Sequence, residues 1–137
     1  MNIQLKISAE ISAECSKAWE YYTIPAHITG WNFASDDWCC PSAENDLRNG
    51  GKYKARMEAK DGSMGFDFEA IYDEVIPQKK ISYTMGDGRK AQVEFESTGK
   101  GTFVTVVFDA EDTNPPKMQQ QGWQAILNNF KKYTESR

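Results

Sequence analysis

The chain has 137 residues, 39% of them hydrophobic, and a formal net charge of −4, which suits one packed core and is too little for two. No apolar run is long enough to span a membrane, and the N-terminus lacks the pattern of a signal peptide, so we expect a soluble, cytoplasmic protein without a membrane partner. The acidic balance also disfavours nucleic acid as a partner, because neutralising phosphates takes a concentrated cationic face. We expect a single domain over residues 1–137.

The first thirty residues predict a strand followed by two short helices. Apolar and polar residues alternate over residues 3–9, as in a half-buried strand. Ser12 is the expected N-cap of the first helix, whose residues Cys15, Ala18, Trp19 and Tyr22 share one apolar face. A second helix is expected after Thr23, since Pro25 fits a first helical turn, and it ends by Gly30.

Residues 31–51 show no sustained period and contain several breakers, so we predict a long loop there. Two large indoles, Trp31 and Trp38, belong to this segment. Such side chains stay in a loop only where they cover or line something apolar. They either line a binding site or close one end of the core.

The next sixty residues predict five strands. Residues 52–60 and 66–73 alternate and are separated by a turn, so they form a hairpin that sets Lys54 and Arg56 opposite Asp67 and Glu69 on its outer face. Three more strands are expected at residues 81–85, 91–96 and 102–109, joined by short turns. The parity changes near Val75, which indicates a bulge or a strand end.

A long helix closes the chain. We expect it to be capped by Asn114, to begin at Pro115 and Pro116, and to run to about Glu135. Its apolar stripe contains Trp123, Ile126, Leu127, Phe130 and Tyr133. Gly122 interrupts it, so either a neighbour packs closely there or space is left open.

These elements predict an α+β helix-grip fold. A curved antiparallel sheet of about six to seven strands wraps on the long C-terminal helix, and two short helices follow the first strand. Curvature of the sheet can leave a hollow between the sheet and the helix.

Several motifs resemble the START-like, or SRPBCC, superfamily, in the branch of homologues of the heat shock protein 90 ATPase activator. They are Trp19, Trp31 with Asn32, NDLRNGG at 45–51, Arg56 with Met57, DGSMGFDF at 61–68, Tyr72, DGR at 87–89 and GWQAILNNFKKY at 122–133. The resemblance covers essentially the whole chain and implies the helix-grip fold. It also implies an apolar or amphipathic small molecule held between sheet and helix.

The leading functional hypothesis is therefore binding of a small hydrophobic or aromatic molecule, without a cofactor. The chain carries four Trp, six Tyr and seven Phe, many of them on predicted inner faces. The candidate ligand-binding residues are Trp31, Trp38, Tyr53, Phe66, Phe68, Tyr83 and Trp123. The same residues could instead fill the interior completely.

An enzyme of the cyclase or hydrolase type is a less favoured alternative. Nucleophilic catalysis would have to pair Cys39 or Cys40 with His27, the one histidine of the chain. Among the carboxylates, Asp36 and Asp37 in the predicted loop are the candidates to inspect. Cysteine and histidine spacing predicts no metal site.

The remaining alternative is a protein-interaction module, a homodimer or a chaperone-associated domain acting through the outer face of the sheet. Ile71 and Val107 are the apolar side chains expected on that face. The co-chaperone that the family is named after also depends on a separate N-terminal domain, which has no counterpart in these residues. Direct activation of a chaperone is therefore not expected.

Overall fold

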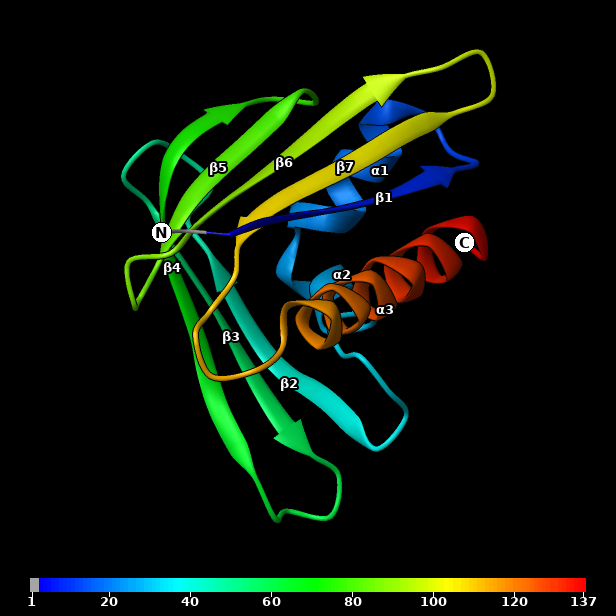
Figure 1. Cartoon of the computed structure of the whole chain (residues 1–137). Coiled ribbons are helices and arrows are strands. Elements are labelled where there is room, and N and C mark those ends of the chain that lie inside the picture. The colour runs from blue at the N-terminus through cyan, green and yellow to red at the C-terminus, as the bar shows by residue number, and fades with distance from the viewer. Residues whose placement is uncertain (1–2) are drawn as a thin grey trace.

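In the computed structural model, which describes residues 3–137, the alternating segments form one seven-stranded sheet (Figure 1). Its strands are β1 (Gln4–Ile11), β2 (Trp38–Asn45), β3 (Lys52–Ala59), β4 (Gly65–Ile76), β5 (Lys80–Met85), β6 (Lys90–Ser97) and β7 (Thr102–Asp109). Neighbouring strands are antiparallel, in the order β1-β7-β6-β5-β4-β3-β2. Each link other than β1 to β7 joins strands consecutive in sequence, so short turns suffice.

Three helices complete the fold. Two short ones, α1 (Cys15–Thr23) and α2 (Pro25–Ile28), follow β1, and the long α3 (Pro116–Glu135) ends the chain. Figure 1 shows the sheet curling around α3, with α1 and α2 on the same concave side. The predicted helix-grip fold is therefore confirmed. No helix within residues 3–137 is long and apolar enough to cross a membrane.

The core consists of two clusters of different size. The larger joins α1 and α3 to the sheet, and its side chains with the least exposure include Phe108, Phe130 and Ile11. The smaller comprises Cys40, Ala55 and Met57 on β2 and β3. Side chains of Tyr53 and Phe68 pack against both clusters, so two candidate ligand-binding residues lie where the clusters meet.

The predicted loop at residues 31–51 is wrong in part, because β2 occupies its second half. A register shift between Cys39 and Ser42 changes which face the side chains point to, and this hides the period of the strand. Pro41 lies within the shift, where a residue without an N–H interrupts the ladder least. The bulge expected near Val75 is confirmed by a register shift between Tyr72 and Glu74.

The two predicted helix caps, Ser12 and Asn114, are wrong, whereas the second helix begins at Pro25 as expected. The N-cap positions belong to Glu14, Ile24 and Pro115, and none of these side chains caps its helix by a hydrogen bond. Thr23 instead belongs to α1, where its hydroxyl donates to the carbonyl of Trp19. Ser12 and Asn114 make other contacts: the Ser12 N–H donates to Glu135, and the N–H and side-chain amide of Asn114 donate to Glu111.

Polar side chains of α3 bind the free edge of β1. Three of them donate to main-chain carbonyl oxygens: Gln120 to Lys6 (2.9 Å), Gln124 to Ser8 (3.1 Å) and Lys131 to Glu10. The carbonyls of an edge strand have no strand partner, so these bonds satisfy them within the molecule. They also fix the position of α3 along the sheet.

The outer face of the β3–β4 hairpin carries the predicted charges. Lys54 and Arg56 lie opposite Glu69 and Asp67 in the register, and both cations reach Asp67, at 3.8 and 3.5 Å. Ile71 is 45% exposed on this face, as expected, and Phe103 on β7 is a further exposed apolar residue. Ion pairs this exposed contribute little to stability.

Gly122 faces open space, since a Cβ built there meets no atom within 4 Å. We expect Gly122→Ala to raise the free energy of unfolding by up to about 1 kcal/mol, because alanine is the better helix former. Urea unfolding followed by circular dichroism measures the change. Gly51→Ala is the matched control and should destabilise, because its Cβ would collide with the carbonyl oxygen of Asp46. A loss of stability in Gly122→Ala would contradict the prediction.

Candidate functional site

A cavity of about 350 Å³ lies between the concave face of the sheet and α3. Of the seven candidate ligand-binding residues, six line it: Trp31, Tyr53, Phe66, Phe68, Tyr83 and Trp123. Trp38 is not among the lining residues and packs against the Cys40, Ala55 and Met57 cluster, with its ring 6.1 Å from that of Phe66. The space has the size of a site for a small organic molecule.

Two tryptophans form fixed parts of the cavity wall. Trp123 lies parallel to Phe108 with ring centroids 3.9 Å apart, which holds the indole against the sheet. Trp31 is 4% exposed, stacks on Tyr22, and donates its indole N–H to the carbonyl of Tyr21 at 2.9 Å. Trp31 thus belongs both to the core and to the cavity wall. The two roles considered for this indole, lining a binding site and closing the core, are therefore compatible.

Phe66 marks the open end of the cavity. Its side chain is 50% exposed although it lines the cavity, so solvent reaches the interior beside it. Phe68, two residues along the same strand, is half-buried and meets Tyr53 and Tyr83 edge to face. Aromatic exposure therefore falls along β4 from the opening toward the interior.

Four tyrosines bring hydroxyl groups into this apolar space. Burial raises the pKa of Tyr22, Tyr53, Tyr72 and Tyr83, so these phenols stay protonated at neutral pH. The hydroxyl of Tyr72 donates to Asn45 at 2.6 Å, and that of Tyr53 accepts from Asn32 at 3.4 Å. The hydroxyls of Tyr22 and Tyr83 have no hydrogen-bond partner within residues 3–137, so they are available to a ligand.

Two charged residues that were not among the predicted ligand-binding residues, Arg89 and Glu111, also line the cavity. Arg89 follows the turn between β5 and β6, and Glu111 follows β7. Arg89 was read as part of the hairpin turn at residues 86–89. Glu111 was read as part of the connection between β7 and α3. The pairing of the strands explains why Arg89 and Glu111 lie near each other. Ala91 of β6 pairs with Phe108 of β7, so the residues just before β6 and just after β7 meet at one end of the sheet.

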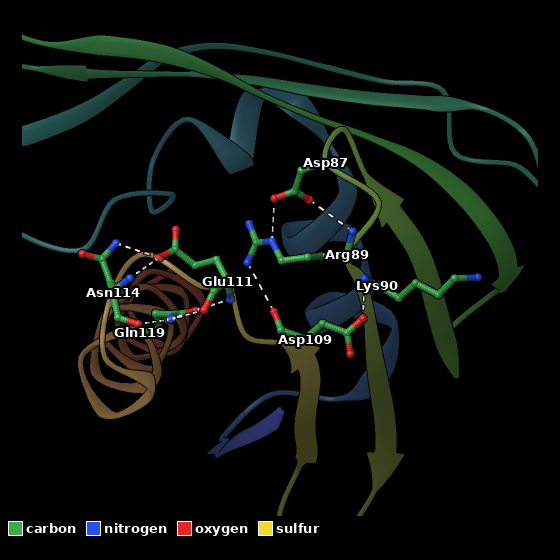
Figure 2. Close-up of polar contacts among 7 residues, drawn as sticks. All are labelled: Asp87, Arg89, Lys90, Asp109, Glu111, Asn114 and Gln119. Carbon is green, nitrogen blue, oxygen red and sulfur yellow. Dashed lines mark hydrogen bonds and ion pairs between the residues drawn. The ribbon is translucent and has the colours of Figure 1, made fainter. Parts of the chain in front are cut away.

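The guanidinium of Arg89 is held in place by two acceptors (Figure 2). Its Nε donates to Asp87 at 2.7 Å, and its Nη1 donates to the main-chain carbonyl of Asp109 at 3.3 Å. The carboxylate of Asp109 accepts from the N–H of Lys90, whose side chain points away from Arg89. The side chain of Arg89 is 24% exposed, so it lies at the boundary between cavity and solvent.

Glu111 belongs to a hydrogen-bonded loop that leads into α3. Its carboxylate accepts from the N–H and the side-chain amide of Asn114, at 2.6 and 2.9 Å. The buried amide of Gln119 exchanges hydrogen bonds with the main chain of Glu111, at 2.8 and 3.1 Å, and donates to the carbonyl of Asn114. These bonds orient the Glu111 carboxylate toward Asn114 (Figure 2).

The candidate catalytic residues lie elsewhere. The Nδ1 of His27 is 2.9 Å from the hydroxyl of Tyr133, and its ring stacks on Tyr21. The thiol of Cys40 points to the carbonyl of Ser42, and burial raises its pKa. Asp36 and Asp37 are exposed. None of these five sequence candidates, Cys39 included, is among the residues that line the cavity within the described chain.

Comparison with known proteins identifies the same fold and a family. The family model described as "Activator of Hsp90 ATPase homolog 1-like protein" matches residues 12–135. An AHSA1-like protein from Aeromonas hydrophila is 42% identical, with 98% of this chain and 93% of that chain covered and a TM-score of 0.93. A protein from Cytophaga hutchinsonii is 48% identical, with 98% and 92% covered and a TM-score of 0.81.

More distant structures share the fold alone. A protein from Chromobacterium violaceum is 22% identical over 97% of this chain and 98% of that chain, with a TM-score of 0.87. Among curated proteins, none matches the chain significantly. A fold that persists at such low identity can support many functions, so function has to be argued from the cavity.

Proposed function

The chain belongs to the family of Activator of Hsp90 ATPase homolog 1-like proteins, and from this premise we propose that it binds a small hydrophobic or aromatic molecule between the sheet and α3. The observation that carries the proposal is the cavity itself, open beside Phe66 and walled by aromatic rings. A cytoplasmic location is part of the same proposal.

The chemistry of the wall supports an apolar ligand. Binding sites for small molecules are mostly apolar, with a few polar groups that orient the ligand. Here Trp123, Phe68 and Ile126 offer apolar surface, while the hydroxyls of Tyr22 and Tyr83 offer directed donors. Burial of such a ligand would remove apolar area from water, which contributes roughly 25 cal/mol per Å².

The neutral dye N-phenyl-1-naphthylamine tests this proposal. We expect one dye to bind per chain. Its fluorescence should rise and shift to the blue, because the aromatic wall of the cavity is less polar than water. Ile126→Trp places a larger side chain in the cavity and should lower the affinity at least tenfold. Asn128→Trp, which puts the same side chain on the exposed part of α3, is the matched control and should bind like the unmodified protein.

Circular dichroism on each variant verifies that the fold is intact, since overpacking can cost about 1 to 3 kcal/mol. If the unmodified protein fails to bind the dye, or if both variants bind equally well, the cavity is not the binding site. The better hypothesis would then be a chaperone-associated module that binds a partner through the outer surface of the sheet. It rests on the family description and on exposed apolar residues such as Met64 and Ile71.

A further inference from the structure

The cavity carries a positive charge at one end. Within residues 3–137, Arg89 is the sole cationic residue among those lining the cavity. Asp87 and the carbonyl of Asp109 each take one of its N–H groups. A guanidinium has five N–H groups in a rigid fork, so further donors remain for a third partner.

The neighbouring carboxylates leave part of the guanidinium without a partner. Asp87, which is 54% exposed, pairs with the Nε of Arg89 at 2.7 Å, and within residues 3–137 it makes no hydrogen bond to the two Nη atoms. The carboxylate of Glu111 is bonded to Asn114, and no ion pair joins it to Arg89 in the part of the chain that the structure describes. The Nη2 of Arg89 therefore has no partner within residues 3–137, and Figure 2 draws no bond between the guanidinium and Glu111.

The free hydroxyl groups can donate hydrogen bonds to a ligand, as the guanidinium can. The phenols of Tyr22 and Tyr83 are protonated, lack partners within residues 3–137 and line the cavity. Arg89 and Tyr83 line the same cavity. Two phenol hydroxyls and one cation thus line one apolar space, and all three can donate to an acceptor on the ligand.

We propose that the ligand is an organic acid, with an apolar or aromatic body against the rings of the cavity and one anionic oxygen group paired with Arg89. This inference rests on the proposed function and adds the polar end of the ligand to it. Carboxylate and sulfonate share the required chemistry, because each presents two or more oxygens that match the guanidinium fork. The geometry of the turn at residues 86–89 would then set specificity.

Two dyes that differ by one charged group test the inference. N-phenyl-1-naphthylamine is neutral, and 8-anilino-1-naphthalenesulfonate has the same ring system with a sulfonate. We expect the anionic dye to displace the neutral one and to bind the unmodified protein more tightly. Arg89→Gln should weaken binding of the anionic dye at least tenfold and change binding of the neutral dye less than twofold.

Lys90→Gln is the matched control, because it removes the same charge at the adjacent residue, whose side chain points away from Arg89. It should leave both dyes unaffected. Glu111→Gln is a second variant, which removes a negative charge from the cavity wall and keeps an acceptor for Asn114. It should tighten binding of the anionic dye about threefold, since the remaining charge acts across a poorly screened space.

The outcomes separate the two proposals. If neither dye binds the unmodified protein, the proposed function fails. If the neutral dye binds but Arg89→Gln weakens both dyes equally or neither, the organic acid is wrong while the apolar site stands. If Arg89→Gln does not fold, Glu111→Gln decides, and an unchanged affinity for the anionic dye overturns the inference. Competition by 1-naphthylacetate and by its neutral amide repeats the comparison with a carboxylate.

Discussion

Replacing Phe130 by alanine is expected to lower the free energy of unfolding by about 3 to 5 kcal/mol, whereas Trp123→Ala should cost clearly less. Phe130 has no exposed surface, and the rings of Tyr22 and Trp31 each lie 5.1 Å from it. Removing its ring would leave a closed void. Trp123 already borders an open cavity, so its removal enlarges a space that exists and sacrifices mainly the stacking on Phe108.

Urea unfolding monitored by circular dichroism measures both variants, with the slope of the transition showing whether the same surface is exposed. Ile71→Ala on the outer face is a suitable control, because its side chain is 45% exposed and its truncation should cost little. A cost for Trp123→Ala that equals that of Phe130→Ala would mean that the indole is packed on all sides. The cavity would then not extend to the face of Trp123.

The protein is expected to lose stability steeply above about pH 10, the ordinary pKa of tyrosine. Burial raises the pKa of Tyr22, Tyr53, Tyr72 and Tyr83 in the folded state. Stability from these groups is fully present below the unfolded-state pKa and is lost as pH rises toward the folded-state values, because only the unfolded chain releases the protons. Four such groups give a slope of up to about 5 kcal/mol per pH unit.

Unfolding free energies measured between pH 8 and 12, together with phenolate absorbance, test this expectation. Tyr83→Phe removes one raised group and should reduce the slope by about 1.4 kcal/mol per pH unit. If the phenols of the folded protein ionised near pH 10 without loss of structure, water would have to reach them freely. The burial that raises the pKa of these phenols would then be refuted.

The fold could be predicted because, in most strands, every second residue faces the core from one end of the strand to the other. In β3, for example, Ala55 and Met57 are buried while Lys52 is exposed, and the printed sequence shows this alternation directly. The long helix was equally clear from its apolar stripe. At the bulge in β2, the inward-facing positions change from odd to even or the reverse. The alternation of apolar and polar residues is lost there, so the strand could not be predicted.

The aromatic wall of the cavity followed from the same alternation, since inward positions of the sheet and helix are those that face each other. Trp38 begins β2, next to the register shift, and is not among the residues that line the cavity. Arg89 and Glu111 could not be recognised from periodicity, since both lie outside regular elements. Their position depends on which strand ends meet, and sequence spacing alone contains no such information.

The two outer strands of the sheet differ in how they resist strand addition by another molecule. Along β1, the side chains of Gln120, Gln124 and Lys131 occupy carbonyls that an incoming strand would need. In β2, Pro41 and the shifted register break the regular row of donors and acceptors. The breakers that concealed β2 in the sequence thus disfavour the addition of another strand at this edge.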